Sequence, residues 1–444
     1  MTVQEWITND KVIRHSRKAY AHFDYRTDIS VKRAYITDSH NVAHHGFYPF
    51  IHYEMVMYRY RKGRRTKKTR DLCYAAHIDR CIFQYYGFIL NELYNKRIRI
   101  DGIENVAVAY RTDLHQTNIE FSKRAFDYIN ALKSAYVMIG DFTHFFDNLD
   151  HQYLKRQWCS LLGDEQLPED HYNVFKHVTA YSKWELKDLL LINGLEDTRA
   201  GRRALNRKSR VLTKEEYRKY RSHISKHTEP YGIPQGSPIS SVLANVYMLE
   251  VDKRINNLVT SHSGMYMRYS DDFIIVLPEA EESEIESIFD EVQRLINDAP
   301  RLLLEPNKTQ YFRVSEHTVK NCGKTFHDEA DESKKDFIDF LGFRFNGKEV
   351  RIRPKTITKY YYRMYRKAKT VAKVGGYTPD GKHISCKELY SLYSERGARG
   401  RNFLSYVYKA DGIYDHREPI TRDTKRHMQK IRKVLNSKAE TQPE

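Results

Sequence analysis

The sequence has few cysteines, and none of them forms a recognisable metal or disulfide motif. The five cysteines, Cys73, Cys81, Cys159, Cys322 and Cys386, include no pair at Cys-x-x-Cys spacing. This pattern argues against a zinc site and a disulfide framework, and it fits a reducing cytoplasm. The sequence also has no apolar run of roughly 18 residues and no signal-peptide core at its N-terminus. We therefore expect a cytoplasmic protein that makes no membrane contact.

Acidic residues are too few to balance the basic ones. Lys and Arg number 75 against 58 Asp and Glu, which gives a formal net charge of +17. A surplus of this size favours a polyanionic partner, more often nucleic acid than an anionic membrane. Many of the 34 tyrosines stand among cations, as in 58–61 and 360–363. This mixture suits base stacking with phosphate neutralisation, although most tyrosines are expected to be packing residues.

The chain of 444 residues is longer than one compact core usually serves, so two or three subdomains are expected. Local patterns predict a basic loop at 59–70, a helix at 71–97, a short strand at 106–110, a partly helical basic insertion at about 164–230, an amphipathic helix at 282–298, a hairpin at 337–353 and a basic helical tail from about 355.

The clearest strand prediction is the apolar run 136–140, which stops at Asp141. Asp150 is then predicted to cap a helix that Gly163 ends. Ser237 is predicted as the N-cap of a later helix, with Pro238 in its first turn.

Two acidic segments suggest a metal site. Asp271 and Asp272 stand together at a predicted turn between two apolar arms, and their repulsion is usually offset by a divalent cation. Such pairs also occur at ordinary turns, so this one is weak evidence alone. Asp141 directly follows a predicted strand, whereas Asp147 and Asp150 are better explained as helix caps. Three carboxylates on neighbouring strands would suffice for two Mg²⁺ ions about 3.5–4 Å apart, as nucleotidyl transfer requires.

A turn rich in glycine and proline, Gly232 to Pro238, lies between these acidic segments in the chain. Glycines let a backbone approach a ligand closely, and Gln235 can donate and accept hydrogen bonds at a base or sugar edge. Such a turn before a helix is common, but its position between the acidic segments makes it informative.

These three elements, in this order, resemble motifs of the reverse transcriptase family. Residues 141–146 are similar to its first palm motif, 232–238 to its nucleotide-binding turn and 269–272 to its Tyr-x-Asp-Asp box. Asn307-Lys308-Thr309 resembles its lysine motif, and Phe340-Leu341-Gly342-Phe343 resembles its primer-grip hairpin. The resemblance implies an α+β fold: a right-hand polymerase with fingers, an antiparallel-sheet palm and a helical thumb.

The resemblance also implies roles for single residues. Asp141, Asp271 and Asp272 become the catalytic residues and the ligands of two Mg²⁺ ions, with Mn²⁺ as an alternative. The implied substrate-binding residues are Phe142, Phe146, Arg111, Gln235, Gly236 and Lys308. Phe146 would be the steric gate against a ribose 2′-hydroxyl, with Phe145 as an alternative gate and core packing as the alternative role. Arg111 would contact the triphosphate, and Lys308 would donate a proton to pyrophosphate.

The same resemblance divides the chain into domains. We expect an N-terminal extension and fingers at 1–135, a palm at 136–335 with the basic insertion at about 164–230, a primer-grip hairpin at 336–350, and a helical basic thumb at 351–444 with a disordered tail at 437–444.

The residues after the predicted primer-grip hairpin bear on which subgroup of reverse transcriptases the chain resembles. It has neither the acidic cluster of an RNase H domain nor the Cys/His pattern of a homing endonuclease. Segment 141–154 resembles bacterial defence-associated, abortive-infection-type (unknown-group) reverse transcriptases. This implies antiviral (anti-phage) defence through nascent cDNA made on a noncoding RNA template, with dNTPs as substrates. A homo-oligomer, or a partner protein encoded nearby, stays open.

Other interpretations remain. A retron- or intron-like reverse transcriptase would run the same chemistry on another RNA. A template-independent or protein-primed DNA polymerase would start on a Tyr or Ser side chain or without a template. The three aspartates disfavour an RNA-binding scaffold with a degenerate palm, and Phe146 disfavours an RNA-dependent RNA polymerase.

Overall fold

The computed structural model describes residues 1–61, 64–306, 308–326, 336–373, 377–378, 383–400 and 402–436. Its chain forms two compact units that alternate along the sequence. The first unit contains 1–111, 142–258 and 290–305, and the second contains 112–141, 259–289 and 306–444. The expected domain boundaries stay predictions, and Asn307 and the expected disordered tail at 437–444 lie outside the described residues.

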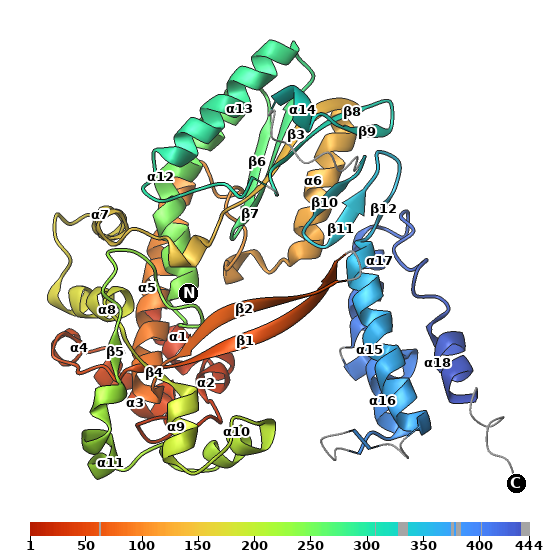
Figure 1. Ribbon diagram of the computed structural model, residues 1–444. Coiled ribbons are helices and arrows are strands. Elements are labelled where there is room, and N and C mark those ends of the chain that lie inside the picture. The colour runs from red at the N-terminus through yellow and green to blue at the C-terminus, as the bar shows by residue number, and fades with distance from the viewer. Residues whose placement is uncertain are drawn as a thin grey trace, which may run out of the picture. The chain divides into compact units, whose positions relative to one another are not determined.

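The first unit is mainly helical around a small mixed sheet (Figure 1). Its elements are α1 (Val3–Thr8), α2 (Asp10–Ser16), α3 (Ile29–Ile36), α4 (Ser39–Ala43), β1 (Phe50–Arg61), β2 (Arg64–Tyr74), α5 (His77–Ile100), η2 (Phe145–Asp147), α7 (His151–Leu162), α8 (Glu169–Thr179), β4 (Ser182–Glu185), α9 (Leu186–Ile192), α10 (Arg199–Leu205), α11 (Lys214–Lys219), η3 (Arg221–His223) and β5 (Ser225–Lys226). The sheet has the order β2-β1-β4-β5. Helix α7 begins after Asp150 and ends at Gly163, as predicted.

The basic run at 59–70 was predicted as a loop, and this prediction is wrong for most of it. Strands β1 and β2 pair in antiparallel register from Ile51 with Tyr74 to Arg61 with Arg64. The run therefore forms part of a long two-stranded ribbon, visible in Figure 1. Its threonines and tyrosines favour strands, and they outweigh the charge pattern that suggested a loop.

The predicted basic insertion is partly helical, as expected, and it has its own apolar core. Trp184, Leu189, Leu190 and Leu205 are buried there. The same cluster includes Phe23 from the N-terminal segment and Ile51 from β1. The insertion is thus built into the first unit by apolar packing that local charge patterns did not reveal.

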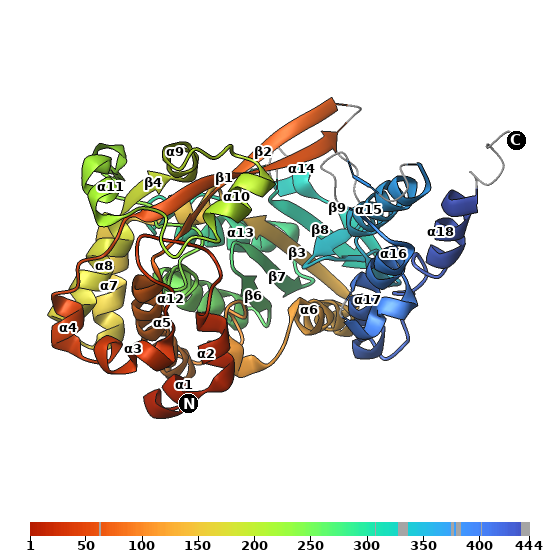
Figure 2. The ribbon, with the colours of Figure 1, turned by 90° about the horizontal axis from the view of Figure 1, so that it is seen from below.

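The second unit is organised around a five-stranded antiparallel sheet of order β6-β7-β3-β8-β9 (Figure 2). Its elements are η1 (Thr112–Leu114), α6 (Asn118–Leu132), β3 (Ser134–Asp141), β6 (Met265–Tyr269), β7 (Asp272–Pro278), β8 (Gln310–Ser315), β9 (Thr318–Asn321), α14 (Gly323–Phe326), β10 (Ile338–Phe340), β11 (Phe343–Phe345), β12 (Val350–Ile352), α15 (Pro354–Lys373), α16 (Cys386–Tyr393), η4 (Glu395–Gly400), α17 (Phe403–Ile413) and α18 (His427–Asn436). Helices α12 (Ser240–Ser261) and α13 (Glu282–Asn297) each pass from one unit to the other. The predicted strand at 136–140 and the helix at 282–298 are confirmed.

The C-terminal part of the second unit is largely helical, as predicted. The expected hairpin at 337–353 has a third strand, because β11 pairs with both β10 and β12. Of the tyrosines at 360–362, Tyr360 and Tyr361 are buried, and their hydroxyls donate to the carbonyls of Tyr393 and Asp423 at 2.7 Å each. Packing is therefore the main role of these two rings.

Three further local predictions are wrong in part or in whole. The helix predicted at 71–97 begins only at His77, because residues 71–74 belong to β2. Residues 106–110 lie in a turn-rich segment instead of a strand, and the buried side chains of 106–109 explain the apolar pattern. Helix α12 begins at Ser240 instead of after Ser237, because a turn precedes it in which the Ser240 N–H donates to the Ser237 carbonyl. Among helices within the described ranges, none combines the length and apolar character that a bilayer crossing requires.

Candidate active site

The strand register of the second unit brings the separate acidic segments together. Asp141 ends β3 and Asp272 begins β7, and these residues are direct antiparallel partners. Asp271 lies in the turn between β6 and β7, where Tyr269 also pairs with Asp272. Asp271 and Asp272 follow Asp141 by 130 and 131 positions in the sequence, and the three carboxylates nevertheless share one end of the sheet.

The turn that carries Asp271 depends on a buried arginine. Ser270 has φ +64, a conformation that is uncommon for a residue with a side chain. Arg268 on β6 is completely buried, and its Nη1 donates to the Ser270 carbonyl at 3.0 Å. This charge-assisted hydrogen bond holds the turn, so Arg268 is a positioning residue that the sequence alone did not reveal.

A glycine beside Asp141 fixes how closely β3 and β7 approach. Gly140 pairs with Phe273, one position from the Asp141–Asp272 pair. A Cβ on Gly140 would lie closer than 3.0 Å to two ring carbons of Phe273 and 3.1 Å from a third. The ring covers the glycine, and only glycine fits beneath it. This glycine contact lies immediately next to the carboxylates in the ladder.

The clustered charges perturb Asp272 strongly. Burial raises the pKa of Asp272 well above its usual range, and the negative charges of Asp271 and Asp141 raise it further. A hydrogen bond with the Asp141 side chain acts in the same direction, while the Arg353 guanidinium lowers the pKa. Like charges placed this closely favour a bound proton or a nearby cation.

Lys308 supplies one cation at this end of the sheet. Its Nζ lies 2.5 Å from Oδ1 of Asp141 in an ion pair. The Lys308 side chain keeps 51% of its surface exposed, against 14% for Asp141. An exposed lysine on a flexible stem can leave Asp141 at small cost when another cation or a phosphate competes.

The residues suit divalent cations chemically, although their side chains are not arranged as a completed site. Carboxylate oxygens are the ligands that Mg²⁺ prefers, and the raised pKa of Asp272 reflects like charges that a cation would relieve. Within the described ranges, no three His, Cys, Asp or Glu side chains are grouped to hold a metal ion. The metal-ligand roles of Asp141, Asp271 and Asp272 therefore stay predictions.

The glycine-rich turn belongs to the first unit, where hydrogen bonds fix it to the segment after Phe146. The Gly232 N–H donates to the Leu149 carbonyl at 2.8 Å, and the Ile233 N–H donates to the Phe146 carbonyl at 2.9 Å. The Gln235 side chain donates to Oδ1 of Asp147 at 3.1 Å. The turn and the segment that follows the first palm motif therefore form one hydrogen-bonded structure.

Glycine is required at Gly236 by both conformation and space. Its φ is +108, and an added Cβ would lie 2.5 Å from the Cys73 carbonyl oxygen at the end of β2. The Cys73 N–H donates to the Gln235 carbonyl at 2.8 Å. The backbone of the turn thus joins β2 directly, as the close approach inferred from its glycines suggests.

Two histidines support the same turn, and no sequence pattern identifies them. His151 Nε2 lies 2.7 Å from the Gly232 carbonyl, and His227 Nε2 lies 2.6 Å from the Tyr231 carbonyl. The His227 ring also stacks on Tyr181, with centroids 4.7 Å apart. His151 and His227 are positioning residues for this turn.

The aromatic residues after Asp141 have different environments. Phe142 and Phe145 are buried and stack with centroids 5.4 Å apart. Phe146 is half-buried and meets Phe145 edge-on at 5.6 Å. Of the two proposed gates, Phe146 has the more accessible ring, and Phe145 has a clear packing role.

Arg111 is buried and hydrogen-bonded to the backbone, whereas its expected contact with a triphosphate would need an accessible guanidinium. Its Nη1 donates to the backbone carbonyl of Glu104. These features give the guanidinium a structural role in the turns at 104–110. Its expected contact with a triphosphate stays a prediction.

An antiparallel sheet that carries paired carboxylates at one end, in a mixed α+β chain, is typical of nucleotidyl-transferring polymerases. A family model described as reverse transcriptase (RNA-dependent DNA polymerase) matches residues 81–345. This match spans more than half of the sequence, and the chain belongs to the reverse transcriptase family. The predicted α+β right-hand polymerase class and the predicted reverse transcriptase family are thereby confirmed.

Solved structures give a more distant likeness. Apo telomerase from Candida tropicalis, truncated from its C-terminal domain, is 10% identical with a TM-score of 0.40, and the match covers 74% of this chain and 61% of that one. Telomerase from Candida albicans in complex with a TWJ fragment of telomeric RNA is 11% identical with a TM-score of 0.38, covering 93% and 68%. The chain thus spans about three fifths of the first of these telomerases. No curated protein matches the sequence significantly.

Proposed function

We propose that this protein is an RNA-directed DNA polymerase that makes cDNA by two-metal nucleotidyl transfer. The observation that carries the proposal is the register of the second unit's sheet, which pairs Asp141 with Asp272 beside Asp271. Such a cluster favours a bound proton or cation that relieves its repulsion, and in a chain of the reverse transcriptase family this favours a catalytic role.

Asp141, Asp271 and Asp272 would hold a pair of Mg²⁺ ions. When bound, such ions lower the pKa of a primer 3′-hydroxyl and neutralise the triphosphate and the departing pyrophosphate. Arg268 would keep the 270–271 turn in position through its bond to the Ser270 carbonyl.

The other residues would bind and select the nucleotide. Lys308 would exchange Asp141 for the triphosphate and donate a proton to pyrophosphate, which its exposed side chain allows. The Gln235–Gly236 backbone would line the nucleotide site, and Phe146 would exclude a ribose 2′-hydroxyl. Asp141, one of the three proposed metal ligands, is followed directly in the chain by Phe142, one of the proposed nucleotide-binding residues.

The biological setting we propose is bacterial defence against phage, with a noncoding RNA as template. The support is the resemblance of segment 141–154 to defence-associated reverse transcriptases. The +17 net charge suits a protein that holds RNA and nascent cDNA.

The test is to sequence the RNA and DNA that copurify with the wild type, with Asp271→Ala/Asp272→Ala and with Asp290→Asn. Asp290 is an exposed carboxylate on α13 and serves as the control. We expect cDNA complementary to one copurifying RNA in the wild type and control, and none in the double variant. DNA that persists in the double variant would refute the polymerase assignment. DNA without a complementary RNA, or joined to the protein, would refute RNA templating or ordinary priming.

A second test examines the metal separately from synthesis. Mg²⁺ should raise the unfolding midpoint of the wild type and of Asp290→Asn, because binding to the folded state alone stabilises it. Asp272→Asn should lose most of this increase. An equal Mg²⁺ effect in all three proteins would remove the carboxylates as ligands.

A further inference from the structure

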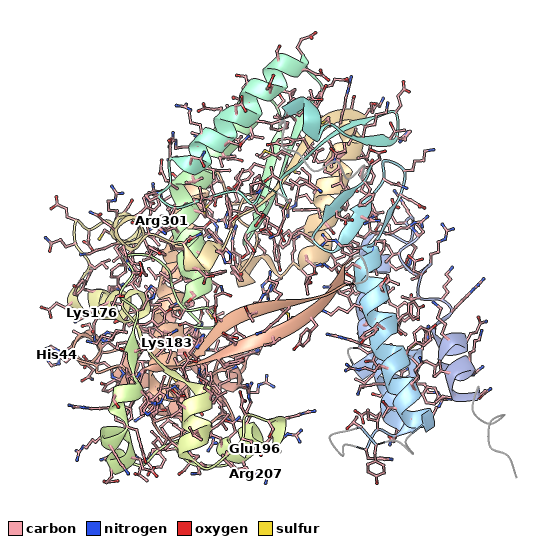
Figure 3. The ribbon with its side chains drawn as sticks, viewed as in Figure 1. His44, Lys176, Lys183, Glu196, Arg207 and Arg301 are labelled. Carbon is pink, nitrogen blue, oxygen red and sulfur yellow. The ribbon has the colours of Figure 1, made fainter. Side chains whose placement is uncertain are left out.

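A dense basic cluster outside the candidate active site lies on α10 and the turn after it. Residues 199–210 contain six Lys and Arg and no Asp or Glu. We call Arg199, Arg203, Arg207 and Lys208 the α10 basic surface. Figure 3 labels Arg207 beside α10.

Three members of this surface recur at helical spacing. Arg199, Arg203 and Arg207 are four positions apart, and side chains at this spacing lie on one face of a helix, roughly 5–6 Å apart at Cβ. Arg207 lies two residues beyond Leu205, the last residue of α10, and its N–H donates to the Ala204 carbonyl, so the backbone continues past the helix in a tighter i→i−3 turn. The row runs in one direction at a spacing suited to successive phosphates of a nucleic-acid strand.

The arginines of this row are available for a partner. Arg199, Arg203 and Arg207 are exposed, and within the described part of the chain none of them takes part in an ion pair. Arg202, which points elsewhere, pairs with Asp197 at 2.6 Å and lies over the Tyr53 ring. The carboxylate nearest in sequence is therefore already occupied by a cation outside the row.

The fold does not require the charges of the row. Helix α10 is held by Leu205, which is buried with Val211 and Leu212 in the core of the insertion. A Cβ on Gly201 would overlap the Glu196 carbonyl, so the chain before α10 lies directly on the helix. These contacts fix the helix while its charged face stays outside.

The turn after α10 is fixed to the N-terminal segment. The Ala21 N–H donates to Oδ1 of Asn206 at 3.0 Å, and the Val211 N–H donates to the His22 carbonyl at 2.8 Å. Tyr25 keeps 63% of its surface exposed, and the Arg210 guanidinium lies 4.7 Å from its ring centre. An exposed aromatic ring held by a cation beside a basic row suits stacking of an unpaired base.

We infer that the α10 basic surface binds RNA outside the candidate active site, with the arginine row on successive phosphates and Tyr25 beneath an unpaired base. The inference rests on the proposed function in one respect, since an RNA-templated reaction makes RNA the polyanion that this chain must hold. The surface would keep a distal part of the template RNA attached while the 3′ end of the primer is extended.

The test compares two triple variants with equal charge changes. Arg199→Gln/Arg203→Gln/Arg207→Gln removes the row. Lys11→Gln/Arg33→Gln/Lys176→Gln removes three exposed cations from other helices of the same unit, where Figure 3 labels Lys176. Binding of a labelled RNA hairpin with an unpaired tail is followed by anisotropy across a salt series, in an Asp271→Ala/Asp272→Ala background that prevents synthesis.

We expect the row variant to bind the hairpin about tenfold more weakly, with a salt slope smaller by about three, one for each lost phosphate contact. The control variant should keep most of both. Tyr25→Ala should weaken binding of the tailed hairpin but not of a blunt one. On a short template–primer, the row variant with intact aspartates should extend DNA at the wild-type rate.

Equal binding by the row and control variants would overturn the inference. A DNA hairpin of the same sequence should show a similar loss, because phosphate contacts and base stacking do not read the ribose 2′-hydroxyl. Failure of extension by the wild type would count against the proposed function instead, since binding is measured without synthesis.

Discussion

Substitution of Gly140 by Ala tests whether the close approach of β3 and β7 positions the carboxylates. The new Cβ would come closer than 3.0 Å to two ring carbons of Phe273, whereas carbon atoms normally pack at about 3.5–4.0 Å. Phe273 is 1% exposed, so the ring has no open space into which to retreat. We expect a loss of about 3 kcal/mol of folding free energy, the upper end of overpacking costs.

The same substitution should reduce catalysis. Gly140 and Phe273 are neighbours in the ladder of Asp141 and Asp272, so a ring displaced by about an ångström would shift the carboxylates too. Misplacement of this size commonly lowers rates by about 100-fold. DNA synthesis on an RNA template, measured well below the unfolding midpoint, separates this effect from lost stability.

Matched variants make the reasoning refutable. Gly412→Ala, in α17 of the same unit, places its Cβ in open space and should stabilise by up to about 1 kcal/mol. Phe273→Ala alone should cost about 3–5 kcal/mol, but combined with Gly140→Ala it should show a favourable coupling of about 1–3 kcal/mol. Urea unfolding is followed by circular dichroism, because all three tryptophans lie in the other unit. A coupling near zero would show that the ring does not enforce glycine.

Three further outcomes are expected. Phe146→Ala should admit ribonucleotides, whereas Phe145→Ala should mainly lower stability; unchanged sugar selectivity in Phe146→Ala would remove its gate role. Burial, assisted by a neighbouring histidine, lowers the pKa of His22 to about 3, so the unfolded chain binds a proton that the folded chain rejects. The contribution of His22 to folding stability should therefore be complete above about pH 6.5 and fall by up to about 1.4 kcal/mol per pH unit as the pH decreases towards 3. Urea unfolding midpoints measured at several pH values should depend less steeply on pH in His22→Gln than in the wild type. An equal dependence in the two proteins would contradict the assignment. His151→Ala leaves the Gly232 carbonyl without its 2.7 Å partner, and this loss should lower the free energy of unfolding by about 1–3 kcal/mol. The KM for nucleotides should rise about tenfold or more, and His151→Gln should restore part of both losses. An unchanged KM would show that the turn keeps its position without His151.

The parts of the fold that sequence patterns predicted are those with strong local periodicity. The apolar run before Asp141 forms the buried strand that its pattern predicts, and Asp150 with Gly163 mark both ends of α7. Residues 106–110 have a similar apolar pattern without being a strand, because turns can also bury a short apolar run. Local patterns cannot distinguish these cases, since pairing with a distant strand decides the outcome.

The candidate site was accessible through its charged residues and motifs, but its supporting residues were not. Arg268 reads in sequence as an ordinary exposed cation, and its burial follows only from the position of β6 in the sheet. His151 lies at the start of a predicted helix, where nothing in the pattern indicates a partner at Gly232, 81 positions later. Both residues act through backbone carbonyls, which leave no mark in a sequence of side chains.

The charge balance of the site supports the proposed metal binding without reference to motifs. Three carboxylates meet at one end of the sheet, and within the described part of this unit Lys308 and Arg353 are the cations whose interactions with them are resolved. Arg353 also lies 3.6 Å from Asp339, so part of its charge is already balanced. A nucleoside triphosphate brings further negative charge, and it would be repelled by a site that is negative before it arrives. The +17 net charge of the chain attracts nucleic acid over long distances, but it does not reverse the sign at this point. Divalent cations that accompany the nucleotide would supply the positive charge that Lys308 and Arg353 leave unbalanced at these three carboxylates.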